Sequence, residues 1–169
     1  YKTDLFIDTI KLLEQVSGKV YGADEKDTKA MRIIADHTRT AVMLIGDKNG
    51  IPTEVRNAIE EIENDSKDFK SVTVLLVFNY SGQYDIVQAV NRMLTDKVTN
   101  IDEKEIRKYL LTSDYPDPDL IVRTSGEFRI SNYFLYQAAY SEFYVTDTLW
   151  PDMSKEEIDK AIDSFYHRE

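Results

Sequence analysis

The sequence of 169 residues contains no cysteine, which excludes disulfides and thiolate metal sites and makes a cytoplasmic setting the natural expectation. It has no apolar run near the ~20 residues that span a bilayer, and no signal-peptide pattern opens it. Basic residues are outnumbered, 21 Lys and Arg against 31 Asp and Glu, so the formal net charge is −10. Because a general nucleic-acid surface needs a basic face, nucleic acid is not a favoured partner. A few converging arginines can still bind a phosphate group.

The composition is that of a soluble globular protein of about one ordinary domain. Apolar residues make up 42% and charged residues 31%, a balance that supports a packed core and is not typical of a disordered chain. The sequence opens on Tyr1 and not on methionine, so we expect a trimmed or partial chain.

The first 41 residues predict a helical segment. One helix begins at Thr3, a good N-cap, and ends at Gly18, and a second runs from Asp27 towards Thr38. The intervening residues 21–26 are polar and indicate a loop.

Residues 42–169 show a different pattern, in which short apolar runs alternate with helical periodicity. Four runs predict buried strands: Ala41–Ile45, Val72–Tyr80, Leu120–Val122 and Phe143–Val145. Five segments predict helices: one opening at Pro52, one marked by Ile86, Val87, Val90 and Leu94, then Glu103–Leu111, Asn132–Tyr140 and Ser154–Tyr166. This alternation predicts an α/β fold with a mostly parallel sheet flanked by helices.

Ligands of open α/β sheets bind beyond the carboxyl ends of the strands, and one strand end here carries suitable residues. Arg123 directly follows a predicted strand, Gly126 permits a tight turn, and Arg129 lies on the returning loop. Ser131 and Asn132 are placed to cap the next helix. Guanidinium forks, a hydroxyl and helix N–H groups together form a cradle for a diphosphate. In the alternative interpretation the two arginines pair with acidic side chains and Ser131 is only a cap.

Two nearly contiguous stretches resemble the carboxy-terminal signature of the cis-prenyltransferases, the undecaprenyl diphosphate synthase type of enzyme. They are Asp117-Pro-Asp-Leu-Ile-Val-Arg-Thr-Ser-Gly-Glu-Phe-Arg-Ile-Ser-Asn132 and Tyr140-Ser-Glu-Phe-Tyr-Val-Thr-Asp-Thr-Leu-Trp-Pro-Asp152. Upstream, Ile45-Gly-Asp47 and Phe78-Asn-Tyr-Ser-Gly82 resemble the preceding family segments in order and spacing. The resemblance covers about residues 42–168.

The resemblance implies roles for four residues. Arg123, Arg129 and Ser131 match the residues that hold the diphosphate of isopentenyl diphosphate, and Glu142 matches a glutamate that helps to bind Mg²⁺. In the alternative interpretation, Glu142 is a solvated carboxylate before a strand. The implied reaction condenses isopentenyl diphosphate onto an allylic diphosphate to give a polyprenyl diphosphate of the undecaprenyl type. The implied assembly is a homodimer or heterodimer, brought transiently near a membrane by its lipid product.

The sequence departs from the family in two places. At Ser81 and Gln83 the family has a glycine and an arginine, which removes any role assigned to that arginine. Nothing in residues 1–47 matches the family's Asp-Gly-Asn-Gly-Arg loop, whose aspartate binds the metal and the allylic diphosphate. Residues 1–45 instead resemble an internal stretch of bacterial alanyl-tRNA synthetases, with Ile34-Ala-Asp-His-Thr-Arg39 as the best match. We therefore interpret residues 1–41 and 42–169 as two segments of different resemblance.

Three functions follow from these resemblances. The chain is a cis-prenyltransferase that is incomplete alone, a non-catalytic subunit or diphosphate-binding relic of that family, or an alanyl-tRNA synthetase fragment. The last is the weakest, because a net charge of −10 disfavours tRNA.

The first testable prediction concerns Arg129, one of the two arginines of the expected cradle. Arg129→Ala should weaken isopentenyl diphosphate binding by about 1.5–3 kcal/mol, the loss typical of a charge-assisted hydrogen bond. Calorimetric titration in the presence of Mg²⁺ measures this difference, and an unchanged affinity would remove Arg129 from the site.

Overall fold

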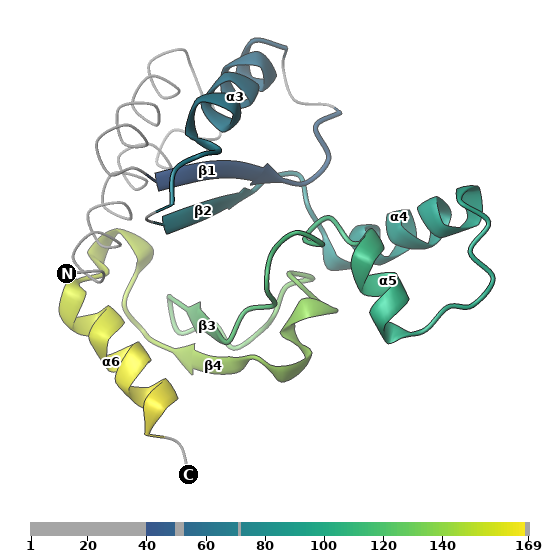
Figure 1. Cartoon of the computed structure of the whole chain (residues 1–169). Helices are drawn as coiled ribbons and strands as arrows, with labels where there is room; N and C mark the ends of the chain where they lie inside the picture. Colours follow the sequence, from purple (N-terminus) through teal and green to yellow (C-terminus); the bar gives the residue numbers. More distant parts are fainter. Residues whose placement is uncertain (1–39, 50–52, 71, 168–169) are drawn as a thin grey trace. The chain divides into compact units, whose positions relative to one another are not determined.

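The computed structural model describes residues 40–49, 53–70 and 72–167 (Figure 1). The two helices expected within residues 1–39 and the helix start expected at Pro52 lie outside these ranges. The chain divides into two compact units, with the boundary between Asn79 and Tyr80.

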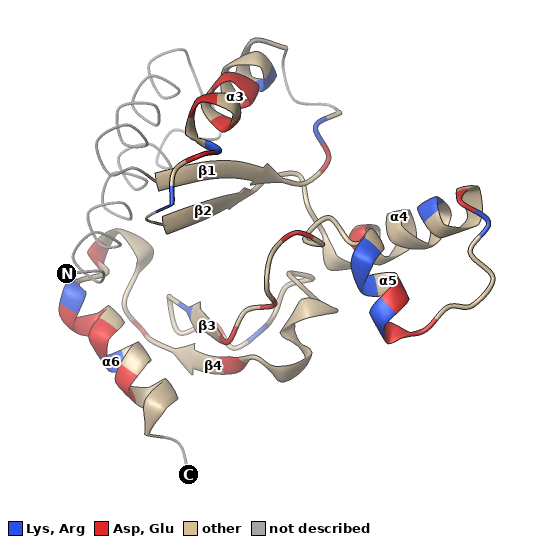
Figure 2. Cartoon of the chain, in the orientation of Figure 1, with Lys and Arg blue, Asp and Glu red and all other residues tan. Residues whose placement is uncertain are grey.

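The first unit is a β-α-β arrangement of strand β1 (Thr40–Ile45), helix α3 (Thr53–Ser66) and strand β2 (Val72–Val77). The strands are parallel, in register from Thr40 opposite Val72 to Ile45 opposite Val77. Neither strand contains a charged residue, and both are tan in Figure 2. The strand predicted at 41–45 is thus confirmed, while the one predicted at 72–80 ends three residues early.

Helix α3 supplies hydrogen-bond acceptors to the edge of β1 that faces away from β2. Ser66 Oγ accepts from the N–H of Val42 at 3.0 Å, and Glu63 Oε1 accepts from the N–H of Leu44 at 2.7 Å. The carbonyl of Ile45 accepts from the N–H of Phe78, which directly follows β2. Alternate residues of β1 therefore form their backbone hydrogen bonds at the edge that faces β2. Side chains of α3 therefore satisfy backbone donors that a further strand would otherwise have to pair.

The second unit contains a parallel pair of short strands with helices on either side in the sequence. Strands β3 (Leu120–Arg123) and β4 (Glu142–Val145) pair with Leu120 opposite Glu142 and Arg123 opposite Val145. The helices are α4 (Gly82–Thr95), α5 (Glu103–Tyr109) and α6 (Lys155–Tyr166), with 3₁₀ turns η2 (Gln137–Tyr140) and η3 (Trp150–Asp152). The α/β fold and its parallel strand pairing are confirmed, and the four described strands form two two-stranded sheets.

Helix α6 is fixed to β4 by one carboxylate. Glu157 Oε1 accepts hydrogen bonds from Tyr144 Oη at 3.0 Å and from Thr146 Oγ1 at 2.7 Å. Hydrogen bonds from Thr146, Lys160 and Tyr144 lower the pKa of Glu157. Ser154 caps the helix by accepting from the N–H of Glu157, as expected for a helix opening at that serine.

The helix predicted at Asn132–Tyr140 is wrong. Only the 3₁₀ turn η2 forms there, because Ser131, Asn132 and Phe134 have φ values of 51°, 59° and 44°. These lie in the left-handed region, which a right-handed helix cannot contain. Residues 131–134 are thus a turn whose conformation must be held by contacts elsewhere.

Helix α4 is where it was expected, but its buried face differs from its most apolar one. Gly82, Asp85, Ala89 and Met93 are buried, whereas Val87, Val90 and Leu94 are exposed. Gly82 has a packing reason, since a Cβ there would lie 2.6 Å from Leu135 Cγ. The buried stripe recurs at i, i+3 or i+4, and it includes an acidic residue.

No helix among residues 40–49, 53–70 and 72–167 is both long enough and apolar enough to cross a membrane.

Two neighbouring residues of α4 give a matched test of this packing. Met93 is completely buried and Leu94 is 65% exposed. Met93→Ala should lower the free energy of unfolding by about 2–5 kcal/mol, through lost burial and the cavity left behind. Leu94→Ala should change it by about 0.5 kcal/mol or less. Urea denaturation followed by circular dichroism compares the two variants, and equal losses would contradict the observed orientation of α4.

Candidate functional site

The candidate site lies beyond the carboxyl end of β3, where the loop of residues 124–131 begins. The segment after β4 holds this loop: Ser125 donates its N–H to Thr148 O at 3.0 Å and Gly126 donates to Thr146 O at 2.8 Å. Gly126 has φ 65°, and a Cβ on it would lie 2.7 Å from Asp147 Oδ1. The left-handed conformation therefore favours glycine at this position, whereas the contact with Asp147 involves the end of a side chain that can shift.

Arg123 and Ser131 are brought together as the sequence predicts. Arg123 Nη2 donates to Ser131 Oγ at 3.4 Å. The Nε atom of Arg123 is buried and has no hydrogen-bond partner. A guanidinium group is an obligate donor, so a buried Nε–H without an acceptor is unfavourable and an anionic oxygen would satisfy it. The pair thus presents a cation, a hydroxyl and an unused donor at one strand end.

Arg129 is exposed and forms an ion pair with Glu127 of the same loop. This contact matches the alternative interpretation, in which a loop arginine pairs with an acidic side chain. An ion pair between two exposed side chains contributes little, roughly 0–1 kcal/mol, so an anionic ligand can replace Glu127 at small cost.

The helix N-terminus expected next to Ser131 is absent, because Asn132 caps a different helix. Asn132 O accepts from the N–H of Gly82 at 2.6 Å, and its Oδ1 accepts from the N–H of Gln83 at 3.0 Å. Both donors belong to the first turn of α4. The expected contribution of helix N–H groups to phosphate binding is therefore wrong, and a backbone turn stands in that place.

Glu142 does not join the Arg123–Ser131 pair. It opens β4 while Arg123 closes β3, which separates them by three residues along the strands, roughly 10 Å. Side chains alternate between the two faces of a strand, so Glu142 shares a face with Tyr144, which contacts α6, and Arg123 lies on the other. The parallel register thus places the two predicted ligand groups at opposite ends and on opposite faces.

A metal ion fits this donor set only together with another source of oxygen ligands. Within the described part of the chain, no three His, Cys, Asp or Glu side chains gather to hold a metal. Mg²⁺ is often bound by one or two carboxylates and the phosphates of a substrate. Glu142 can supply one such oxygen, so the described residues offer a ligand and not a complete metal site.

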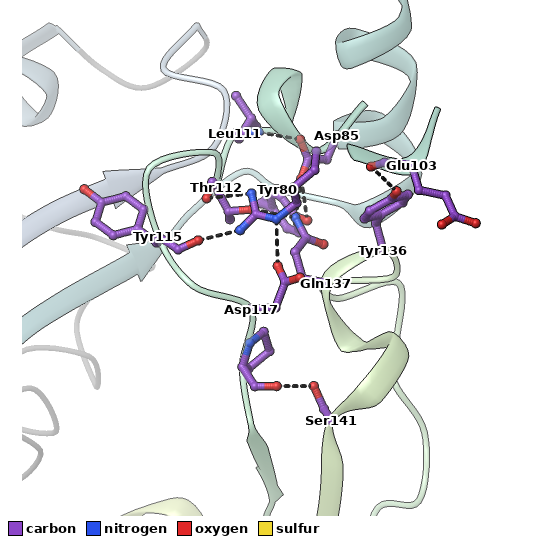
Figure 3. A network of polar contacts seen from close by, with 12 residues as sticks. Tyr80, Asp85, Glu103, Leu111, Thr112, Tyr115, Asp117, Tyr136, Gln137 and Ser141 are labelled. Atoms are coloured by element: carbon purple, nitrogen blue, oxygen red, sulfur yellow. Dashed lines mark hydrogen bonds and ion pairs between the residues drawn. The ribbon is translucent and has the colours of Figure 1, made fainter. Parts of the chain in front are cut away.

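A buried polar network, which the sequence analysis does not include, supports the second unit (Figure 3). Asp85 is 1% exposed, and its carboxylate accepts four hydrogen bonds of 2.8–3.0 Å from neutral donors. The donors are Tyr80 Oη, Gln88 Nε2, Leu111 N and Gln137 Nε2. Burial, then the hydrogen bond and charge of Asp85, raise the pKa of the Tyr80 hydroxyl.

Arg107 extends the network along the loop between α5 and β3. It donates to the carbonyls of Thr112 and Tyr115, and its Nε lies 3.0 Å from Asp117 Oδ1. Figure 3 shows these contacts converging on one guanidinium group. The loop leading into β3, and hence to Arg123, is held by this arginine.

One signal could have revealed the network from the sequence. Asp85 lies four and eight residues before the small or apolar residues Ala89 and Met93, so all three share one helix face. A carboxylate on a buried stripe needs several donors, and this requirement alone indicates a structural network.

Comparison with known proteins identifies the family of the chain. The family model of the undecaprenyl diphosphate synthases, a group of prenyltransferases, matches residues 14–169. The chain belongs to this family. The match also includes residues 14–41, and the likeness of that segment to alanyl-tRNA synthetase stays a prediction.

Relatives of the undecaprenyl diphosphate synthase family agree with this placement. An isoprenyl transferase of Fusobacterium nucleatum is 50% identical over 124 residues, which are 73% of this chain and 54% of the relative. One of Thermotoga maritima is 43% identical over 135 residues, 78% of this chain and 58% of the relative. The chain thus spans little more than half the length of these relatives.

Two solved structures show the same fold. A probable undecaprenyl diphosphate synthase from Campylobacter jejuni superposes with a TM-score of 0.80 at 21% identity, covering 98% of this chain and 90% of the other. Lavandulyl diphosphate synthase from Lavandula x intermedia, in complex with dimethylallyl diphosphate, gives a TM-score of 0.75 at 26% identity, covering 88% and 72%.

The buried carboxylate gives the prediction of this subsection. Asp85→Ala leaves four donors of the network without their acceptor and should lower the free energy of unfolding by about 3 kcal/mol or more. Asp114→Ala is the control, because Asp114 is exposed, and it should change stability by about 0.5 kcal/mol or less. Chemical denaturation measures both, and comparable stabilities of the two variants would show that the network contributes nothing.

Proposed function

We propose that the chain binds the diphosphate of isopentenyl diphosphate at Arg123 and Ser131, as the diphosphate-binding part of a cis-prenyltransferase. The observation that carries the proposal is the approach of Arg123 to Ser131 beyond the carboxyl end of β3, with the buried Nε of Arg123 left without an acceptor. Family membership over residues 14–169 and the relatives' name, isoprenyl transferase, support it.

In the proposed reaction these residues bind and orient one substrate. The carbon–oxygen bond of the allylic diphosphate breaks, the double bond of isopentenyl diphosphate attacks the resulting cationic carbon, and a proton is lost. Arg123 and Ser131 would fix the diphosphate of the attacking molecule, and Arg129 would add a charge after leaving Glu127. Their contribution is positioning, which converts an encounter of two substrates into a reaction between held groups.

The proposal includes Mg²⁺ as an ion that the diphosphate oxygens bind. A hard divalent ion neutralises charge on phosphate oxygens and so makes diphosphate a better leaving group. Glu142 would supply one carboxylate oxygen to it. Because Glu142 and Arg123 lie at opposite ends of the strand pair, we assign no step of the reaction to their joint action.

We further propose that the chain acts with a partner, either a second copy or a complete member of the family. The given sequence lacks the family's Asp-Gly-Asn-Gly-Arg loop. The residues for the allylic diphosphate would then come from outside the given sequence. In the alternative form of this proposal, the chain is a non-catalytic subunit that only binds diphosphate.

The test is calorimetric titration of isopentenyl diphosphate with Mg²⁺ into the chain and two variants. Arg123→Ala should weaken binding about ten-fold or more, the loss of a charge-assisted contact. Arg92→Ala removes an exposed arginine near the end of α4 and should leave binding unchanged. A folded chain that does not bind, or equal losses in both variants, would overturn the proposed site.

Chain elongation separates the two forms of the proposal. Incorporation of isopentenyl diphosphate onto farnesyl diphosphate by the chain alone would make it an enzyme. Binding without turnover, with turnover only after a complete family member is added, would make it a subunit.

A further inference from the structure

Asn132 occupies an unusual place, because it accepts two hydrogen bonds at the start of α4, about 50 positions away in the sequence, where Ser81 is the N-cap. At the start of an α-helix the N–H groups of the N-cap and of the first three helical residues have no partner within the helix. In α4 the N–H groups of the first three helical residues belong to Gly82, Gln83 and Tyr84. Asn132 accepts two of them, one through its backbone carbonyl and one through its side chain, and Ser81 Oγ accepts the third at 3.2 Å.

The left-handed backbone conformation of this turn is energetically unfavourable, so other contacts must offset its cost. Ser131 and Asn132 are both left-handed, and asparagine tolerates that region better than most residues while serine does not. Two hydrogen bonds to the start of α4 hold Asn132 in place. Ser131, its neighbour, is thereby kept in a strained conformation that it would otherwise leave.

The packing around α4 reinforces the same turn. Leu135 lies so close to Gly82 that no side chain fits there, and Tyr133 stacks on Phe134 with ring centroids 4.3 Å apart. Tyr80 contacts both rings edge to face. Contacts at the start of α4 therefore hold residues 132–135 in place.

Ser131 connects residues 132–135, which the start of α4 holds, to the proposed diphosphate site. Its hydroxyl lies 3.4 Å from Arg123 Nη2, a contact that depends on where residue 131 is held. We infer that Asn132 is a positioning residue, which holds the Ser131 hydroxyl against Arg123 by capping α4 through both of its oxygens. The inference rests on the proposed function, and it deepens that function by naming what places the site.

The decisive variant is Asn132→Gly, since glycine accepts the left-handed backbone and only the side-chain acceptor is lost. The amide of Gln83 should exchange with solvent faster, whereas the amide of Gly82, which donates to the retained backbone carbonyl, should change little. Binding of isopentenyl diphosphate with Mg²⁺ should weaken about three- to ten-fold, the size expected when one neutral contact is misplaced.

A double-mutant cycle shows whether Asn132 acts through Ser131. If it does, Asn132→Gly should weaken binding less than about two-fold further in a Ser131→Ala background, because the positioned group is already gone. Lys97→Gly is the matched control: Lys97 is also left-handed, at φ 57°, but lies at the other end of α4. It should leave binding and both amides unchanged.

The outcomes separate the inference from the function on which it rests. Unchanged protection of Gln83, unchanged affinity of Asn132→Gly, or additive losses in the cycle would each overturn the role of Asn132 while the diphosphate site stands. A folded parent chain that does not bind isopentenyl diphosphate would overturn the proposed function and the positioning role together.

Discussion

The second unit depends on the burial of one carboxylate. Asp85 cannot leave its donors without exposing a charge to an interior that does not solvate it, and this cost is several kcal/mol. Its donors come from Tyr80, from α4, from the start of the loop after α5 and from Gln137, so four separate segments are drawn to one point. Gln137 in turn opens η2, which follows shortly after the turn of residues 131–134 in the sequence. The position of the site thus depends on the hydrogen bonds that the buried Asp85 requires, although Asp85 is not part of the site.

The sequence predicts the strands of this fold well, and the reason is physical. Short runs of Val, Ile and Leu bounded by turn residues are typical of strands, so the position of β1 and the start of β2 can be read directly. Caps that serve their own helix, such as Ser154, are equally readable. The edge of β1 is different, because the acceptors Ser66 and Glu63 are polar residues of a helix, and their use on a strand is a matter of tertiary structure.

The site was predictable only in part, and Asn132 shows why. Serine and asparagine before an apolar stretch are typical of a helix start, yet nothing local tells which helix an asparagine caps. Here its oxygens serve α4, and the residues that follow take left-handed conformations in place of a helix. Glu142 shows a second limit. Its separation from Arg123 follows from the pairing register, which strand patterns alone do not give.

A net charge of −10 does not conflict with a diphosphate site, because charges act over short distances in water. At physiological ionic strength the Debye length is about 8 Å, so exposed charges farther than this from a bound anion are largely screened. The carboxylates that affect anion binding most are those near the loop of residues 124–131. They are Glu127, which forms an ion pair with Arg129, and Asp147, which lies beside Gly126. Glu127 lies in an exposed pair and is readily displaced, whereas Arg123 donates from a partly buried position where its charge is felt more strongly. Local geometry, and not overall charge, therefore decides whether this acidic chain binds an anion, and the diphosphate site that we propose depends on Arg123.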